Sequence, residues 1–220
     1  MKYKVIEKFI SVNGEGLRSG ELSTFIRFFG CNLRCRFCDS KYTYDESEHC
    51  DMMDEQQILE YLISTNVKNV TLAGGEPLYQ QGIKELIVLL CNAGFRVEVE
   101  TNGAHSIAPF MDIVNRPSFT LDYKTGCSGM TKFMDTSNYK YVTKHDSVKF
   151  VVGSIDDLDM MRHIVDDYEL LKKTNVLISP CYGDIEPVEI VEYMKEHNLN
   201  GYKMQIQMHK VIWDAEKRGV

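Results

Sequence analysis

The sequence lacks any long hydrophobic run. Its 220 residues contain no stretch of roughly 18 apolar residues, the length at which a helix becomes a candidate for crossing a bilayer. The first residues also lack a basic region followed by an apolar segment, the pattern of a secretion signal. We therefore expect neither secretion nor membrane insertion, and we expect a cytoplasmic protein with no membrane partner.

The sequence lacks an excess of positively charged residues. The chain has 25 Lys and Arg against 32 Asp and Glu, a formal net charge of -7, and its isoelectric point is near 5.4. Proteins that bind nucleic acids usually concentrate Lys and Arg on one surface. A direct nucleic-acid partner is therefore not expected.

Internal repeats, low-complexity tracts and linkers rich in Pro, Gly and Ser are all absent. Hydrophobic residues make up 44% of the chain, enough for one sizeable core at this length. We therefore expect residues 1–220 to form a single domain.

Short apolar runs and amphipathic stretches alternate along the chain. The runs, rich in β-branched residues and closed by turn residues, predict strands at 23–30, 69–75, 95–103, 118–124, 147–153 and 175–183, with a further candidate at 202–208. Apolar residues at helical spacing predict helices at 54–66, 83–94, 156–171 and 187–198. This alternation is typical of a parallel sheet with helical crossovers.

The chain is short for a complete eightfold barrel, which usually takes about 250 residues. Residues 39–53 also show no amphipathic helix, so one crossover should be a loop. We therefore expect an α/β fold: a partial, incomplete TIM-like barrel of about six parallel strands with a reduced helix set.

Polar residues gather where the predicted strands end. They are the three clustered cysteines, the sequence GGEP at 74–77, the sequence ETNG at 100–103, Asp122, Lys124 and Ser179. The carboxyl ends of parallel strands meet at one edge, where the strands fix the loops and helix N-termini offer free N–H groups. We therefore expect the functional site at that edge of the sheet.

Three of the seven cysteines, Cys31, Cys35 and Cys38, fall within one short loop. In a reducing compartment, clustered thiols favour metal binding over disulfides. Each iron of a cubane 4Fe-4S cluster needs one outside ligand, so three cysteines leave one iron open, as catalytic sites require. The alternative is structural zinc, which needs a fourth ligand; His49 and Cys50 are the nearest candidates.

The C-x3-C-x2-C spacing, with Phe37 before the last cysteine, resembles the signature of the radical S-adenosylmethionine (SAM) superfamily. The resemblance implies that SAM chelates the open iron and that its reductive cleavage gives a 5'-deoxyadenosyl radical. GGEP is similar to the motif that receives the methionine amino group, through Glu76 and the backbone of Gly75. On this basis residues 1–220 are expected to be one radical SAM domain.

Four further features narrow the prediction. The sequence SVNGEG at 11–16 places glycines around Glu15, although Asn-Gly is also a hairpin-turn signal. Arg27 lies within an apolar strand and should face an anion, from the protein or a substrate. Ser40 offers a hard oxygen ligand suited to Mg²⁺, although a serine at such a position, taken in isolation, favours a turn or cap residue. We expect the last residues, from 205 to 220, to be ordered and not a flexible tail.

Together these features resemble the 7-carboxy-7-deazaguanine synthase family, along the whole chain. The resemblance implies a homodimeric, Mg²⁺-dependent carbon-nitrogen lyase of queuosine biosynthesis, supplied with electrons by a donor such as flavodoxin or ferredoxin. It would convert 6-carboxy-5,6,7,8-tetrahydropterin to 7-carboxy-7-deazaguanine, with ring contraction and loss of ammonia.

The same resemblance assigns roles to positions of this sequence. It implies cluster ligation by Cys31, Cys35 and Cys38, and Mg²⁺ ligation by Ser40. The positions implied at SAM are Phe37, Cys38, Asp39, Gly75, Glu76, Glu100, Asp122, Tyr123 and Lys124. The positions implied at the substrate are Val12, Asn13, Gly14, Glu15, Arg27, Ala73 and Val220, with Glu15 and Arg27 as the catalytic residues.

One departure and two alternatives remain. The family often has Thr where this chain has Ala73, so a hydroxyl contact with the pterin would be lost. A glycyl-radical-enzyme activase shares the cysteine spacing but does not account for Arg27 or for SVNGEG. A zinc-binding or iron-sulfur module without a substrate is the non-catalytic alternative.

Overall fold

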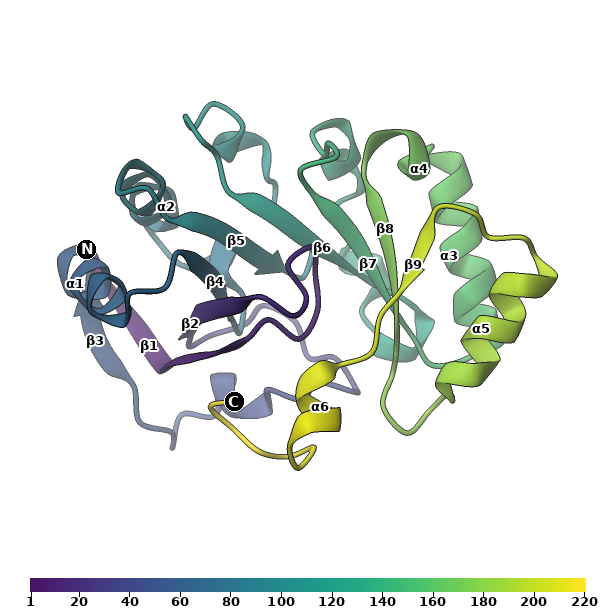
Figure 1. Ribbon diagram of the computed structural model, residues 1–220, viewed down its shortest axis with the longest axis horizontal. Coiled ribbons are helices and arrows are strands. Elements are labelled where there is room, and N and C mark those ends of the chain that lie inside the picture. The colour runs from purple at the N-terminus through teal and green to yellow at the C-terminus, as the bar shows by residue number, and fades with distance from the viewer.

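The computed structural model describes all residues, 1–220, and contains one nine-stranded sheet (Figure 1). The strand order is β3-β1-β2-β4-β5-β6-β7-β8-β9. The strands are β1 (Lys2–Val12), β2 (Leu22–Phe28), β3 (Asp51–Asp54), β4 (Asn69–Gly74), β5 (Arg96–Thr101), β6 (Ser118–Lys124), β7 (Ser147–Val152), β8 (Asn175–Pro180) and β9 (Tyr202–Met204).

Neighbouring strands from β2 to β9 pair in parallel, whereas β1 pairs antiparallel with both β2 and β3. The sheet curves but does not close, because β3 and β9 lie at its two free edges. The expected partial barrel of parallel strands is therefore confirmed. The antiparallel strands β1 and β3 were not predicted. β1 alternates buried and exposed residues with many charges, so it lacks the apolar run that marks the other strands.

Helices follow most of the parallel strands, as predicted. They are α1 (Glu55–Thr65), α2 (Ile83–Asn92), α3 (Ile155–Asp167), α4 (Leu170–Lys173), α5 (Pro187–Glu196) and α6 (Met208–Ile212). Six short 3-10 segments occupy loops: η1 (Lys41–Tyr44), η2 (Pro77–Tyr79), η3 (Ala108–Phe110), η4 (Gly126–Ser128), η5 (Thr131–Phe133) and η6 (Thr136–Lys140). As expected, no α-helix lies between β2 and β3.

Local signals explain the helix ends. Asp54 and Gln57 form a reciprocal capping box at the start of α1. Gly94 follows α2 with a φ of +83°, the left-handed conformation that ends helices. The helix predicted at 156–171 is interrupted, because Glu169 adopts a φ of +51° between α3 and α4.

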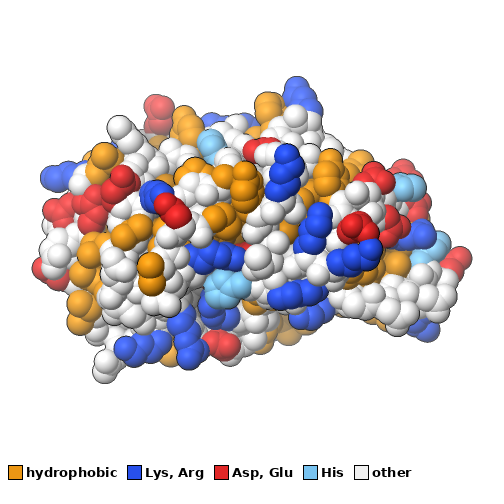
Figure 2. Space-filling model, turned by 90° about the horizontal axis from the view of Figure 1, so that it is seen from above, with side chains coloured by type: hydrophobic (Ala, Val, Ile, Leu, Met, Phe, Trp, Pro, Cys, Tyr) orange, Lys and Arg blue, Asp and Glu red, His pale blue; other side chains and the backbone are white.

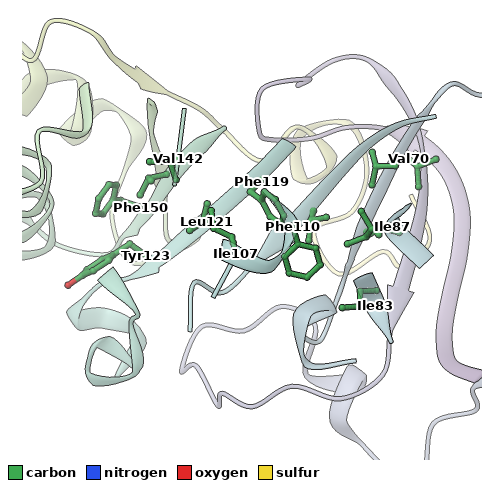
Figure 3. Close-up of a cluster of buried hydrophobic side chains, with 14 of the residues drawn as sticks. Val70, Ile83, Ile87, Ile107, Phe110, Phe119, Leu121, Tyr123, Val142 and Phe150 are labelled. Atoms are coloured by element: carbon green, nitrogen blue, oxygen red, sulfur yellow. The ribbon is translucent and has the colours of Figure 1, made fainter. Parts of the chain in front are cut away.

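The hydrophobic core lies between the sheet and its helices (Figure 3). Phe110 packs edge-on against Phe119, with ring centroids 5.6 Å apart, and Tyr123 lies 5.3 Å from Phe150. These side chains fix the parallel strands and hence the loops at their ends.

No helix is apolar and long enough to cross a membrane. The net negative charge is not evenly spread. On the face in Figure 2, Lys and Arg side chains gather across the middle. A hollow of about 620 Å³ elsewhere in the fold is lined by Arg18, Arg96, Arg116 and His145, with no Asp or Glu.

Candidate active site

A cavity of about 650 Å³ opens at the carboxyl edge of the parallel strands. Most residues predicted for the site line it: Val12, Asn13, Gly14, Glu15, Arg27, Cys31, Cys35, Phe37, Cys38, Asp39, Ser40, Ala73, Gly75, Glu100, Asp122, Lys124 and Val220. Residues from both ends of the sequence thus meet in one cavity.

The loop between β1 and β2 enters the barrel. A β-carbon on Gly16, whose φ is +79°, would come within 2.6 Å of Glu98 Oε1, so only glycine allows this close approach. Asn13 Nδ2 donates to Glu98 Oε2 at 3.1 Å. The sequence SVNGEG therefore forms part of the loop of the β1–β2 hairpin, the alternative that its Asn-Gly pair indicated. It also forms part of the cavity wall.

This loop carries Glu15 across the barrel to distant strands. Ser179 Oγ donates to Glu15 Oε1 at 2.6 Å, and Lys149 Nζ lies 3.3 Å from Glu15 Oε2. Lys149 also lies 3.5 Å from Asp122 Oδ2 and is only 8% exposed. Burial alone would lower the pKa of Lys149, but Glu15, Asp122 and Glu100 raise it, so the ammonium stays charged.

Glu100 shares this environment. Burial raises its pKa to about 7, although Lys149 opposes the shift, and the nearby Glu98 and Glu15 carboxylates add to it. Asp122 Oδ2 also pairs with Lys124 at 2.8 Å, and Lys124 lies over the Phe37 ring at 5.7 Å. The floor of the cavity therefore alternates cations and carboxylates.

The cysteine loop forms one end of the cavity. Cys31, Cys35 and Cys38 are free thiols, all partly exposed. Burial raises the pKa of each, to about 11 for Cys35, while Lys124 lowers all three. Two amide donors approach Cys31 Sγ: Leu33 N at 3.4 Å and Asn102 Nδ2 at 3.8 Å.

No group of three or more His, Cys, Asp or Glu side chains is placed to hold a single metal ion. A zinc site needs its ligands around one point, whereas a cubane binds each thiolate through a different iron. Three thiols on one cavity wall, without a fourth protein ligand, fit a 4Fe-4S cluster with an open iron. The donor set does not favour the zinc alternative.

GGEP packs against the start of the cysteine loop. A β-carbon on Gly75 would lie 2.0 Å from Gly30 O, and Glu76 N donates to the same oxygen at 2.8 Å. The Glu76 carboxylate is fully buried and accepts hydrogen bonds from Leu78 N, Thr101 Oγ1 and Asn102 N. Burial raises the pKa of Glu76 to about 7, against these three donors. Its side chain therefore braces the loops and does not line the cavity.

Arg27 has the protein anion that its apolar strand predicted. Its Nη1 lies 3.4 Å from Glu7 Oε2 and also contacts the Tyr42 hydroxyl. The guanidinium lies over the Phe9 ring, 5.3 Å from its centroid. Arg27 still borders the cavity, so one side of it is available to a ligand.

Ser40 and Asp39 lie side by side at the cavity wall. Ser40 Oγ donates to Asp39 Oδ1 at 3.1 Å. Burial would raise the pKa of the Asp39 carboxyl, but Lys210 and Arg27 hold it below its usual value. The pair offers a hydroxyl and a carboxylate oxygen to a cation.

The structure departs from the sequence-based assignments at Tyr123. Its side chain is 6% exposed and packs in the core beside Phe150, as Figure 3 shows. Because alternate residues of a strand face opposite ways, Asp122 and Lys124 face the cavity while Tyr123 faces away. Only the Tyr123 backbone could contact a cofactor.

Several cavity residues were not predicted: Arg36, Asn102, Lys149, Cys181, Tyr182, Asp184, Gln207, His209, Lys210 and Glu216. Lys149 carried the same signal as Arg27, a lone cation within an apolar strand. Asn102 lies inside the quoted ETNG. The residues of the C-terminal segment gave no local signal, since only the fold brings them to the cavity.

Comparison with known proteins agrees with this geometry. The family model of the radical SAM superfamily matches residues 25–123. The 7-carboxy-7-deazaguanine synthase of Clostridium acetobutylicum is 52% identical over 221 residues, covering 100% of each chain. The enzyme of the same name from Leptospira interrogans is 32% identical, covering 100% of this chain and 99% of its own.

Among solved structures, QueE from Escherichia coli matches with a TM-score of 0.75 at 20% identity, over 94% of each chain. Streptococcus suis SuiB matches with a TM-score of 0.54 at 14% identity, over 81% of this chain and 47% of its own. At these identities the likeness shows the fold alone. Full-length similarity at 52% identity shows more: the chain belongs to the 7-carboxy-7-deazaguanine synthases, a family of radical SAM enzymes.

Proposed function

We propose that this chain converts 6-carboxy-5,6,7,8-tetrahydropterin to 7-carboxy-7-deazaguanine with loss of ammonia, using Mg²⁺ beside its cluster and SAM. One observation carries the proposal. Three thiols and a set of paired cations and carboxylates line one cavity of about 650 Å³. Such a cavity suits a polar, planar substrate held next to a cluster-bound cofactor.

Members of this superfamily use a 4Fe-4S cluster and SAM, which together supply a carbon-centred radical once the cluster is reduced. In this chain Cys31, Cys35 and Cys38 would hold the cluster. The cofactor would lie along Gly75, Asp122 and Lys124, with the Phe37 ring alongside. Glu76 would act indirectly, by holding the Thr101–Asn102 turn against the cysteine loop.

The substrate would occupy the other side of the cavity. Glu15 is held by Ser179 and Lys149, so its carboxylate is fixed before a ligand arrives and can accept pterin N–H groups. Arg27, braced by Glu7, would face the substrate carboxylate. Val12, Asn13, Gly14 and Ala73 complete this wall, and Val220 brings the chain's terminal carboxylate.

Ser40 and Asp39 would provide the Mg²⁺ site between these walls. Mg²⁺ takes few protein ligands and keeps waters or substrate oxygens, so a hydroxyl beside a carboxylate is sufficient. The residues around the cavity would exclude bulk water from the reacting atoms. An external electron donor of the flavodoxin or ferredoxin type, a homodimeric assembly and a cytoplasmic location complete the proposal.

The test is anaerobic reconstitution followed by turnover. We expect about four irons per chain, as a cubane requires, and conversion of the pterin only with SAM, a reductant and Mg²⁺ present. Chelation of Mg²⁺ should slow conversion while leaving the iron content unchanged. Loss of Mg²⁺ dependence in Ser40→Ala, with Ser47→Ala as an exposed control, would support the metal site.

Two outcomes would contradict the proposal. Reconstituted protein that cleaves SAM but ignores the pterin would favour the activase alternative. Protein that binds one zinc per chain and no iron under anaerobic conditions would favour a non-catalytic module.

A further inference from the structure

The last residues of the chain cross the open side of the barrel. After β9, at one edge of the sheet, residues 205–220 pass under the strands toward the β1–β2 side, and the C-terminus lies near that side (Figure 1). We call residues 213–220 the tail. Glu216 and Val220 of the tail line the cavity.

The segment before the tail is tied to the β1–β2 loop. Gly16 N donates to Gln205 Oε1 at 3.0 Å, and Gln205 Nε2 donates to Gly16 O at 2.8 Å. Met208 N lies 3.4 Å from Gly14 O. These contacts fix residues 205–208 but not the tail beyond them.

Within the tail, Arg218 is the only residue whose side chain makes hydrogen bonds to other parts of the chain; the Trp213 backbone N–H donates to His209 O at 3.0 Å. Arg218 Nη1 and Nη2 approach the two Glu48 oxygens at 2.9 and 3.4 Å, and Arg218 Nε donates to Glu7 Oε1 at 3.1 Å. The guanidinium also lies 3.7 Å from the centroid of the Tyr42 ring. A paired, stacked guanidinium is the geometry that arginine provides and lysine does not.

Arg218 shares its acceptor with Arg27. Glu7 Oε2 accepts from the Tyr42 hydroxyl at 2.8 Å and lies 3.4 Å from Arg27 Nη1, while Glu7 Oε1 accepts from Arg218. Two cations thus flank one carboxylate that is only 14% exposed. The tail and the substrate-facing arginine are parts of one charge network.

Gly219 then turns the chain. Its φ of +71° is open to glycine at little cost, and Val220, the next residue, lines the cavity. A fixed Arg218 therefore determines where the terminal carboxylate lies.

We propose that Arg218 is a positioning residue that holds the Val220 carboxylate at the substrate wall through Glu48, Glu7 and Tyr42. The inference rests on the proposed function for what the carboxylate contacts, but the attachment of the tail can be measured without substrate. The ligand class it serves is a planar heterocycle with N–H donors, which a carboxylate accepts.

Trp213, the only tryptophan, lies in the tail and reports its position. In Arg218→Ala, we expect red-shifted Trp213 emission and faster release of Val220 by a carboxypeptidase. Lys217→Ala is the matched control, because it removes a neighbouring exposed cation that has no side-chain partner. Glu48→Gln weakens only one of the three Arg218 contacts, so it should produce a smaller effect in the same direction. Combining it with Arg218→Ala should add little, since Arg218→Ala already removes the Glu48 contact.

In turnover, Arg218→Ala should raise the KM for the pterin about tenfold, leave kcat within about twofold, and leave the iron content and SAM affinity unchanged. Arg218→Lys should recover only part of the loss. Emission, digestion and KM values equal to those of Lys217→Ala would overturn the proposal. If the wild-type protein ignores the pterin, the proposed function fails, whereas emission and digestion still decide whether Arg218 holds the tail.

Discussion

Gly75 lies directly against Gly30, the residue that precedes the first cysteine of the loop. A β-carbon on Gly75 would come within 2.0 Å of Gly30 O and 3.1 Å of Cys31 N. Because both neighbours are backbone atoms, no side-chain rotation can relieve this contact. The second glycine of GGEP is therefore required by the packing of two loops, independently of any contact with a cofactor.

Gly75→Ala should consequently displace the cysteine loop and lower the iron retained after reconstitution, with a stability loss of about 1–3 kcal/mol from overpacking. Iron content per folded chain is the measurement. Gly20→Ala is the control, because its β-carbon would meet nothing within 4 Å and its φ of +87° costs only local strain. Iron content in Gly75→Ala equal to that of Gly20→Ala would mean that the loops can separate freely.

Lys149 pairs with two carboxylates of the cavity floor, Glu15 and Asp122. Lys149→Met would leave Glu15 and Asp122 buried without their shared partner. We expect a loss of about 3 kcal/mol in the free energy of unfolding of the metal-free protein, measured by urea denaturation. Adding Glu100→Gln should restore part of it by removing one negative charge. Lys68→Met, at an exposed position, should change stability by less than about 0.5 kcal/mol.

The sequence predicted the parallel strands well because each is buried on both faces and therefore reads as a continuous apolar run. β1 escaped prediction for the opposite reason, since its partly exposed residues include several charges. Residues at strand ends were found because parallel strands share one edge.

The rest of the site depended on tertiary structure. Successive side chains of a strand point to opposite faces of the sheet. Once Asp122 is placed in the cavity, Tyr123 must point into the core, and this could have been deduced from the sequence. The role of Arg218 could not, because Glu7 and Glu48 are more than 150 residues away in sequence. Local pattern carries no information about such a contact.

Glu100 should make stability depend on pH. Its pKa is about 7 in the folded protein against an ordinary value of 4.5, so between these values the folded state holds a proton that the unfolded state has lost. The contribution of this group to stability therefore falls as pH rises from about 4.5 to about 7, by a total of about 3 kcal/mol.

Glu100→Gln removes this dependence. Relative to wild type, the variant should gain stability between pH 5 and pH 8, as measured by urea unfolding of the metal-free protein at both values. Glu60→Gln, on the exposed face of α1, controls for the loss of a surface carboxylate. The free energy of unfolding of Glu100→Gln is compared with that of the wild type at each pH. If the difference between the two proteins is the same at pH 5 and pH 8, Glu100 is ionised throughout the range.

Arg27 is held in place by side chains outside the cysteine loop. Its contacts are Glu7, Tyr42 and the Phe9 ring, none of which belongs to the cysteine loop. Arg27→Ala should therefore raise the KM for the pterin more than about tenfold while leaving iron content and SAM cleavage close to wild type. Tyr42→Phe, which removes one hydrogen bond from Arg27 and none of its charge, should have a smaller effect in the same direction. A residue that only binds substrate should not affect cluster assembly. Equal losses of iron and of pterin binding in Arg27→Ala would therefore identify Arg27 as a structural ion-pair residue.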